Sequence, residues 1–454
     1  MSDLDVIILA AGMGTRMKSA TVKVLHRAAG RPIIEYVLDL AADVGAASPV
    51  VVIGHQREAV QSAIGDRARF AVQEPQLGTG HAVLMAADDV KARRVLILSG
   101  DVPLTRPETL RQLLDQHEAE KNALTLLTMK LDDPAMYGRI IRDDGGAVAR
   151  IVEAKDASED EKRIAEVNAG IYVFDTAHLF DNLRGLSTKN AQGEYYLTDL
   201  IAVLRKAGYR VGAVIAPDPV EALGVNSRAD LAAVEGEIQR RVVAKLMAGG
   251  VTFRNPNTVV IDSTVTIGND SVVYPFVTIE GTTTIGSGCV IEPGVHLINV
   301  TAGNNVHFKS GTVAEESQID DDASVGPYAH LRPGTHLGTH VKVGNFVETK
   351  KAVFGHGAKA SHLSYIGDAE VGADVNIGAG TITCNYDGVN KNKTVIEDGA
   401  FIGSDTQLVA PVRIGKGAYV GAGSTITKDV PPDSLALSRT PQKIIEGWAK
   451  RKKS

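Results

Sequence analysis

The segment from Ile261 to Leu297 carries an aliphatic residue at every sixth position, and this spacing decides the fold of the second half. It continues in later segments, with a slip of one residue between Ile366 and Val371. The residues at this spacing are Ile261, Ile267, Val273, Ile279, Ile285, Ile291, Leu297, Ile319, Val325, Leu331, Leu337, Val343, Ile366, Val371, Ile377, Ile402, Leu408, Ile414, Val420 and Ile426. Neither a helical period nor strand alternation produces this pattern. It predicts a triangular coil of short parallel strands, with one aliphatic pointing inward on each side and glycine at the tight corners.

The spacing is interrupted in two places. Between Leu297 and Ile319 it lapses, and Asn304, Asn305 and Gly311 predict a bulged coil there. Between Ile377 and Ile402 the gap is 25 residues, one more than four hexads, and it holds the polar segment 384–393. A loop that leaves a regular coil is typical of a functional site, so we expect the chemistry of the second half around it.

Length and composition limit the classes of protein to consider. At 454 residues, with 44% apolar and 22% charged residues, the chain is expected to form two soluble globular domains. The net charge of −6 gives no argument for nucleic acid, and neither a membrane-spanning run nor a leader segment is apparent. Cys289 and Cys384 lie far apart, which argues against a disulfide scaffold or a structural zinc site and suits a reducing cytoplasm.

The first half alternates strand-like and helix-like patterns. Apolar runs predict strands at 5–10, 49–53 and 95–98, and helical spacing spans 33–44. This βαβ alternation predicts a doubly wound, Rossmann-like α/β sheet, in which ligands gather at the carboxyl ends of the strands.

Two features follow strands in this half. The small-residue loop 11–17 includes Arg16, and such a loop lets backbone N–H groups approach phosphates, although a plain tight turn is the alternative. It is neither a P-loop nor a dinucleotide fingerprint, because Met17 stands where the third glycine should be. Asp101 directly follows a strand, where it is either a Mg²⁺ ligand or a turn aspartate. Lys23 lies among apolar neighbours, and a solvated lysine is the usual interpretation.

A helix is predicted to connect the halves. The sequence from Ser227 to Asp230 resembles a capping box, and a stripe of apolar residues follows at helical spacing until Gly249. We therefore expect a first domain over 1–230, a linker helix over 231–250 and the coil over 251–454.

The first half resembles the sugar-1-phosphate nucleotidyltransferases over nearly all of residues 1–230. The matching motifs are Leu9–Met17, Gln76–Ala82, Gly100–Leu104, Tyr137–Ile140, Ile151–Glu153, Asn168–Ile171, Gly193–Asp199 and Gly224–Asn226. One departure is Val22, because the family usually has proline before the loop lysine.

The resemblance implies a role for each matching residue of this half. Arg16 and Lys23 would neutralise the nucleotide phosphates, and Asp101 and Asn226 would hold Mg²⁺. Gln73, Gly78 and Thr79 would hold the uracil and ribose, and Leu9, Ala10, Gly12 and Ser99 would bind substrate. The sugar phosphate would be held by Gly138, Glu153 and Asn168.

The second half resembles the hexapeptide-repeat acyltransferases. The matching motifs are Leu331–Gly334, Val343–Lys351, Ala360–Asp368, Asn376–Gly388, Ile402–Gln407 and Ser438–Arg439. Together, the two halves resemble the family of bacterial bifunctional enzymes that acetylate glucosamine-1-phosphate and uridylylate N-acetylglucosamine-1-phosphate. That resemblance implies a left-handed parallel β-helix and a homotrimer.

By the same resemblance, His362 is the general base of acetyl transfer and Glu348 orients its imidazole. The sugar phosphate would be held by Arg332 and Lys350, with Tyr365, Asn376 and Lys391 nearby. Acetyl-CoA would lie against Ala379, Asn385, Tyr386, Ser404, Ala422 and Arg439. The basic tail 450–453 is either a contact for CoA phosphates or a solvated end. A zinc site at His356 and His362 is a weaker alternative, because no thiol or carboxylate is grouped with them.

The resemblance therefore predicts a two-step cytoplasmic enzyme. Acetyl transfer from acetyl-CoA to glucosamine-1-phosphate would be followed by uridylyl transfer from UTP, giving UDP-N-acetylglucosamine, a precursor of peptidoglycan and lipopolysaccharide, and pyrophosphate. Two alternatives remain: a single nucleotidyltransferase whose coil senses an effector, and one whose coil only trimerises the chain.

Overall fold

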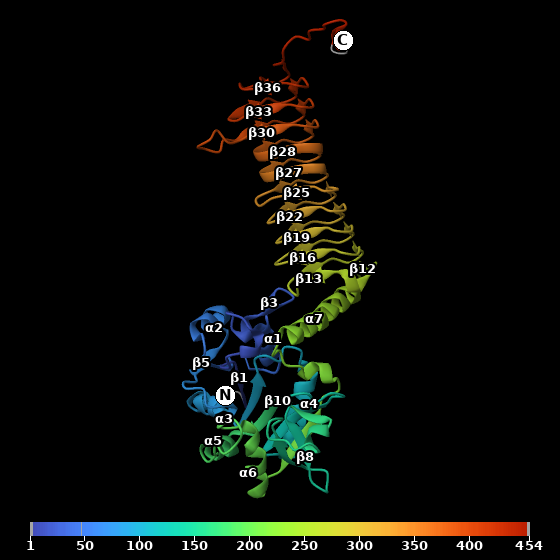
Figure 1. Ribbon diagram of the computed structural model, residues 1–454. Coiled ribbons are helices and arrows are strands. Elements are labelled where there is room, and N and C mark those ends of the chain that lie inside the picture. The colour runs from blue at the N-terminus through green and yellow to red at the C-terminus, as the bar shows by residue number, and fades with distance from the viewer. Residues whose placement is uncertain (1–2, 47, 452–454) are drawn as a thin grey trace. The chain divides into compact units, whose positions relative to one another are not determined.

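The computed structural model describes residues 3–46 and 48–451, so Lys452 and Lys453 of the basic tail lie outside the described residues. The chain divides into two compact units, Met1–Ile238 and Gln239–Ser454. The first unit is a sheet covered by helices and the second is a stack of short strands (Figure 1). No helix within the described ranges is long and apolar enough to cross a membrane.

The first unit is built on a mainly parallel sheet. Along its main path the strands are β11 (Val211–Ile215), β7 (Leu124–Lys130), β10 (Glu166–Asp175), β6 (Arg94–Ser99), β1 (Leu4–Leu9), β4 (Val50–Ile53) and β5 (Arg69–Val72). All neighbours on this path are parallel except that β10 runs antiparallel to β6 and β7. The strands predicted at 5–10, 49–53 and 95–98 are confirmed as β1, β4 and β6.

Helices and a hairpin complete this unit. The helices are α1 (Ile33–Asp43), α2 (Arg57–Ile64), α3 (Thr79–Met85), α4 (Pro107–Ala119), α5 (Thr176–Arg184) and α6 (Leu200–Lys206). The strands β8 (Arg139–Arg142) and β9 (Val148–Val152) form a hairpin whose first strand pairs with β10, and β2 (Arg27–Ala28) pairs with β3 (Arg31–Pro32). Two clusters of buried apolar side chains form the core of this unit.

A single helix, α7 (Arg228–Ala248), spans the segment between the sheet and the coil. Its predicted capping box is confirmed, because Ser227 N donates to Asp230 Oδ2 at 2.8 Å and Asp230 N donates to Ser227 Oγ at 3.2 Å. Asp230 Oδ2 also accepts from the backbone N–H of Asn226 at 3.0 Å. The capping box therefore fixes the backbone of Asn226 as well as the start of the helix.

The second unit is a coil of parallel strands with three sides. One side contains β12 (Thr252–Phe253), β15 (Val272–Val273), β18 (Val290–Ile291), β21 (His307–Phe308), β24 (Ser324–Val325), β29 (Asn376–Ile377), β32 (Phe401–Ile402), β35 (Tyr419–Val420) and β37 (Leu435–Ala436). The next contains β13 (Val260–Ile261), β16 (Thr278–Glu280), β19 (His296–Ile298), β22 (Val313–Glu315), β25 (His330–Leu331), β30 (Ile382–Cys384), β33 (Gln407–Val409) and β36 (Thr425–Ile426). The last contains β14 (Thr266–Ile267), β17 (Thr284–Ile285), β20 (Thr301–Ala302), β23 (Gln318–Ile319), β26 (His336–Leu337), β31 (Thr394–Ile396) and β34 (Val412–Ile414). Two longer strands, β27 (Lys342–Phe354) and β28 (Lys359–Val371), run through all three sides.

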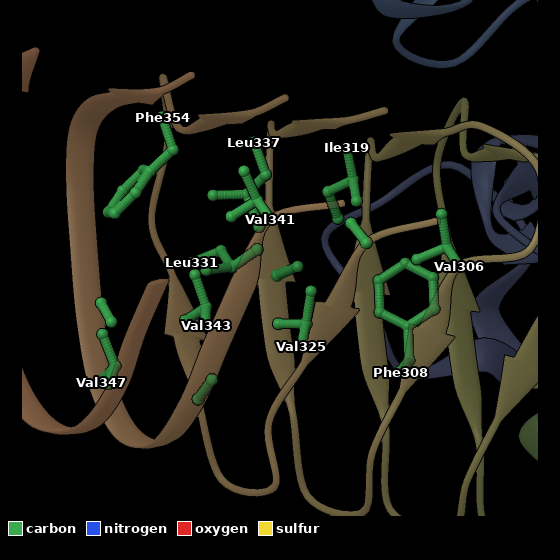
Figure 2. Packing of buried hydrophobic residues seen from close by; sticks show 14 of the residues in the cluster. Val306, Phe308, Ile319, Val325, Leu331, Leu337, Val341, Val343, Val347 and Phe354 are labelled. Atoms are coloured by element: carbon green, nitrogen blue, oxygen red, sulfur yellow. The ribbon is translucent and has the colours of Figure 1, made fainter. Parts of the chain in front are cut away.

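The predicted parallel coil is confirmed, and its inward residues form a continuous core. Figure 2 shows the apolar side chains of successive coils stacked on one another, from Phe308 to Phe354. Glycine is required at the corners where coils come close: a Cβ at Gly286 would lie 2.5 Å from the carbonyl oxygen of Gly303. The left-handed sense of the coil stays a prediction.

The predicted bulged coil between Leu297 and Ile319 is wrong. Ala302, Phe308 and Ala314 occupy the inward positions of this segment, and they are buried. Their strands pair in register with the coils on either side. The lapse has two causes: alanine and phenylalanine replace the usual aliphatics, and the steps from Leu297 to Ala302 and from Ala314 to Ile319 are five residues. The coil is therefore shorter here and not bulged.

The second predicted interruption is a genuine excursion. Between β30 and β31 the chain leaves the coil as a loop closed by an antiparallel bridge between Tyr386 and Lys391. Figure 1 shows this loop projecting from the coil beside β30. A short helix, α8 (Trp448–Arg451), lies near the end of the described chain.

Candidate active sites

The first candidate site is a cavity of about 460 Å³ in the sheet unit. The lining includes the predicted uracil and ribose residues, four further predicted substrate-binding residues, Lys23 and Asp101, whereas Arg16 lines another cavity. These residues are Leu9, Ala10, Gly12, Lys23, Gln73, Gly78, Thr79, Ser99 and Asp101. They come from the carboxyl ends of β1 and β6, where the βαβ pattern predicted a site, and from the loop after β5.

Glycine and amide groups give this cavity its shape. Gly14 has a left-handed φ of 62°, and a Cβ there would lie 2.8 Å from the Cβ of Lys23. The loop can therefore approach the lysine only with glycine at this position. The buried amide of Gln73 donates from Nε2 to the carbonyl oxygen of Gly78 at 2.9 Å, which joins the two segments predicted to hold the base and ribose.

One cation joins the two predicted metal ligands. The Nζ of Lys23 pairs with the Asp101 carboxylate and donates to Asn226 Oδ1 at 3.3 Å. Asp101 and Asn226 therefore present hard oxygen atoms to a shared positive charge, and this donor set suits Mg²⁺. No group of three or more His, Cys, Asp or Glu side chains in residues 3–46 and 48–451 is arranged to hold a metal ion. A site with two protein ligands leaves the remaining positions to phosphate oxygens and water, as Mg²⁺ commonly requires.

Val22, which replaces the usual proline, leaves the turn before Lys23 intact. Its φ is −55°, a value within the range that a proline ring imposes. The valine therefore holds the backbone in the conformation that proline would have set.

A second cavity of about 450 Å³ is lined by the predicted sugar-phosphate residue Glu153 and by Arg16, which was predicted to neutralise the nucleotide phosphates. Thr15 lines both cavities. Glu153 Oε1 accepts from the hydroxyl of Thr198 at 3.1 Å. Burial, followed by the neighbouring carboxylates, raises the pKa of Glu153. Gly138 lies against this side chain, because a Cβ there would be 3.4 Å from Glu153 Oε2.

Asn168 is held beside Gly138 by several hydrogen bonds. Its backbone N–H donates to the carbonyl oxygen of Gly138 at 2.8 Å. Its side-chain amide donates to Tyr172 Oη at 2.6 Å and accepts from Gly170 N at 3.0 Å. The structure thus brings all three predicted sugar-phosphate residues of this half together.

In the coil, His362 lies on β28 beside Asn345 on β27. Its Nδ1 is 2.8 Å from Asn345 Oδ1, and since an amide oxygen only accepts, Nδ1 carries the proton. The Nε2 lone pair is then available to take a proton. Within one chain the Glu348 carboxylate accepts from Arg332 Nη1 at 2.8 Å, and Asn345 contacts the imidazole, so the orienting role of Glu348 stays a prediction.

His362 stands in a column of residues at one corner of the coil. Backbone hydrogen bonds connect the successive turns of this corner: Gly380 N to Leu363 O, Asp405 N to Ala379 O and Gly423 N to Ser404 O. The guanidinium of Arg439 donates to the carbonyl oxygen of Ala422 at 2.9 Å. The predicted acetyl-CoA residues Ala379, Ser404, Ala422 and Arg439 therefore share the corner of His362.

The predicted sugar-phosphate residues of the coil gather on the adjoining side. Arg332 pairs with Glu348, which lies opposite Tyr365 in register. The ammonium of Lys350 lowers the pKa of Lys391. Two lysine side chains held together in this way favour an anion between them.

The remaining predicted residues divide between these groups. Asn385 is buried, donates to Tyr365 Oη at 3.4 Å and also donates to the Asp368 carboxylate. Tyr386 lies in the excursion loop and donates its hydroxyl to Gly388 O at 2.6 Å. Asn376 lies on β29, next to Lys359 and Phe401 in register. The chain therefore presents a corner column that contains His362, which contacts Asn345, and a separate sugar-phosphate group that contains Lys350 and Lys391.

The zinc alternative has no support in the structure. His356 Nδ1 lies 2.7 Å from Thr339 Oγ1, whereas His362 contacts Asn345. The two histidines have different partners, and the described part of the chain contains no suitable cluster of three ligands.

Sequence reasoning missed several residues that hold the predicted ones. Asn345 and Asp368 each lie 17 residues before their partners His362 and Asn385, one turn of the coil away. A turn of three regular hexads has 18 residues, so the sequence signal for these partners is a turn that is one residue shorter, as at the slip after Ile366. Thr198 lies in a matched motif but had no assigned role, and Gln76 lines the nucleotide cavity and donates to Ala11 O.

Known families match both units. The nucleotidyl transferase family matches residues 5–219, and the bacterial transferase hexapeptide family (six repeats) matches residues 264–299 and 393–428.

Relatives described as bifunctional protein GlmU match along the whole chain. The one from Trichlorobacter lovleyi is 53% identical over 453 residues, covering 98% of both chains. Those from Pelobacter propionicus and Heliobacterium modesticaldum are 52% and 53% identical, covering 100% and 98% of this chain and 99% and 98% of the relatives. With a nucleotidyl transferase unit, a hexapeptide transferase unit and this similarity over its full length, the chain belongs to the GlmU family of bifunctional transferases.

Proposed function

We propose that the coil acetylates glucosamine-1-phosphate with acetyl-CoA, and that the sheet unit then joins the product to UTP. The products would be UDP-N-acetylglucosamine and pyrophosphate. The observation that carries this proposal is that one chain contains two separate sites, one suited to binding phosphates and one suited to taking a proton. A cavity with Lys23, Asp101 and Asn226 suits phosphates, and a histidine with a free Nε2 stands on the coil.

In acetyl transfer, His362 takes a proton from the amino nitrogen of the sugar as that nitrogen attacks the thioester carbonyl carbon. The N–C bond forms, the C–S bond breaks, and CoA leaves as a thiol after gaining a proton. Asn345 holds the imidazole with Nε2 as the proton acceptor. Lys350, Lys391 and Arg332 would neutralise the sugar phosphate, and the column from Ala379 to Arg439 would receive acetyl-CoA.

In uridylyl transfer, a phosphate oxygen of N-acetylglucosamine-1-phosphate attacks the α-phosphorus of UTP, and pyrophosphate leaves. Such a displacement needs alignment and positive charge more than covalent chemistry. Arg16 and Lys23 would neutralise the phosphates, while Gln73, Gly78 and Thr79 would hold the uracil and ribose. Gly138, Glu153 and Asn168 would hold the sugar. Mg²⁺, held by Asp101 and Asn226, would supply further positive charge when bound.

We also propose that the chain forms a homotrimer whose neighbouring copies complete the acetyl-transfer site. Two apolar side chains that neighbour the pair of His362 and Asn345 in sequence support this. Phe346, next to Asn345, is 58% exposed, and Leu363, next to His362, is 65% exposed. The Phe346 ring stacks on Tyr328 with 5.7 Å between centroids. A second copy would bury this apolar corner and place its own lysine group near His362.

A cytoplasmic location is part of the same proposal. Cys289 and Cys384 are both free thiols, and free thiols are stable in a reducing compartment. The proposed substrates, UTP and acetyl-CoA, are small molecules, and no nucleic acid or membrane insertion is required.

The test supplies each pair of substrates to the full chain in a separate assay. Acetyl-CoA with glucosamine-1-phosphate should release free CoA, followed with a thiol reagent, and acetyl-CoA alone is the control. UTP with N-acetylglucosamine-1-phosphate and Mg²⁺ should release pyrophosphate. If pyrophosphate forms but CoA release does not exceed the control, the coil is a sensor or a scaffold and the bifunctional proposal is wrong.

A further inference from the structure

The two proposed Mg²⁺ ligands come from segments that are distant in sequence. Asp101 follows β6, and Asn226 lies just before α7. Between their backbones, Val225 N donates to Asp101 O at 2.9 Å. Because a metal ion tolerates little error in ligand spacing, something must hold the two segments together.

Glu221 lies in the segment before Asn226, in the 3₁₀ turn Pro219–Ala222, and is 1% exposed. Its Oε2 accepts from Thr109 Oγ1 at 2.6 Å and from Arg106 N at 3.2 Å. Its Oε1 lies 3.4 Å from Arg106 Nε, and its carbonyl oxygen accepts from Thr105 Oγ1 at 2.9 Å. All of these partners belong to the segment that follows Asp101.

The charge of Glu221 fits its position. A buried carboxylate is strongly destabilising unless it is paired and hydrogen-bonded. Here the carboxylate meets the first turn of the 13-residue helix α4, whose N-terminal N–H groups and dipole favour a negative charge. Arg106 also lies 3.5 Å from Asp218 Oδ2, at the start of the same 3₁₀ turn. Two carboxylates of one segment therefore hold the N-terminus of α4.

We infer that Glu221 is a positioning residue for uridylyl transfer. By holding residues 218–226 against the start of α4, it sets the separation of Asp101 and Asn226 and thus the affinity of the site for Mg²⁺. The inference rests on the proposed function, in which these two residues hold the metal. A purely structural role would lower stability and would leave the metal affinity of the folded protein unchanged.

The test compares Glu221→Gln and Thr109→Val with wild type in the full chain. Glu221→Gln keeps the shape of the side chain and removes its charge, and Thr109→Val removes one hydrogen bond to the same carboxylate. Glu108→Gln is the matched control, because Glu108 lies on the same helix, is 76% exposed and sits 3.6 Å from Arg111. Acetyl transfer by each variant controls for the amount of intact coil, and circular dichroism with thermal unfolding is the control for folding of the sheet unit.

Two readouts are measured: the Mg²⁺ concentration for half-maximal uridylyl transfer, and Mn²⁺ binding in the presence of UDP-N-acetylglucosamine by electron paramagnetic resonance. We expect Glu221→Gln to raise the half-saturating Mg²⁺ by about tenfold and to weaken Mn²⁺ binding similarly. Thr109→Val should act in the same direction by less, while Glu108→Gln and all the acetyl-transfer rates should match wild type. Wild-type metal affinity in folded Glu221→Gln would overturn the inference.

Asp101→Ala separates this failure from a failure of the proposed function. If Asp101→Ala also binds Mn²⁺ as wild type does, the metal assignment itself is wrong. If Asp101→Ala loses the metal and Glu221→Gln does not, only the positioning role is wrong.

Discussion

In the sheet unit, side chains that meet in one site lie far apart in the sequence: Lys23 donates to Asn226, 203 residues away. In the coil, His362 meets Asn345, which lies 17 residues before it. The first contact depends on strand order, on helix packing and on the buried carboxylates that fix loops. The second requires only that one coil stack in register on the next.

This difference has a consequence for mutation. A change in the sheet unit reaches its site through many long-range contacts, whereas a change in the coil acts on the turns directly above and below it. Substitutions that affect one site should therefore spare the other, which permits a series of tests from large effects to small ones.

The largest effects are expected from His362→Ala and Asp101→Ala. His362→Ala removes the general base, so acetyl transfer should fall by about 100-fold or more while uridylyl transfer is retained. Asp101→Ala removes the charged one of the two proposed Mg²⁺ ligands, so uridylyl transfer should fall by about 100-fold or more while acetyl transfer is retained. CoA and pyrophosphate release measure the two rates. Loss of both activities in one folded variant would show that the sites are not independent.

A smaller effect is expected from Asn345→Ala. Without the amide oxygen at Nδ1, the imidazole of His362 loses its preferred tautomer and orientation, and acetyl transfer should fall by about 10-fold to 100-fold. The pH dependence of kcat should change with it, because the base is no longer held by the same partner. Glu348→Gln is the comparison. If it impairs acetyl transfer and shifts the pH profile while Asn345→Ala does not, then Glu348 orients the histidine after all.

Glu153→Gln tests the electrostatics of the sheet unit. Because burial raises the pKa of Glu153, the folded chain binds this proton more tightly than the unfolded chain does. Wild-type stability should therefore decline, relative to the glutamine variant, as pH rises from the ordinary range of a glutamate through the raised pKa. Thermal unfolding from pH 4 to pH 8 should show the variant gaining stability over wild type toward the alkaline end. If the stability difference between wild type and Glu153→Gln were the same at every pH, the raised pKa of Glu153 would be contradicted.

The smallest effect is expected from Gly236→Ala, in the exposed part of α7. A Cβ at this position would meet nothing within 4 Å, so only the helix propensity changes. The variant should gain about 0.5–1 kcal/mol in the free energy of unfolding, with both activities unchanged. Denaturant titration measures the gain, and a loss of stability would show that the helix needs glycine there.

The sequence predicted much of this protein. The six-residue spacing predicted the coil, because each inward position must be apolar wherever coils stack, and the excursion before Thr394 was recognised from the added length. The capping box of α7 was also predicted, since it involves only residues within one turn. The expected bulge is absent because Ala302 and Phe308 fill inward positions and two steps are shortened to five residues, which removes length where a bulge would add it.

The spacing predicted the parallel coil, the motifs predicted the two-part architecture, and the resemblance to known families supplied the candidate residues of both sites. Tertiary structure decided which partners those residues have. Within the chain, Asn345 contacts His362, Lys23 lies between Asp101 and Asn226, and Glu221 is buried against α4. Burial and turn geometry depend mainly on residue type and on near neighbours in the sequence, so local patterns can predict them. A hydrogen bond between distant segments exists only after the backbone has been placed, so its partners are decided by the folded chain.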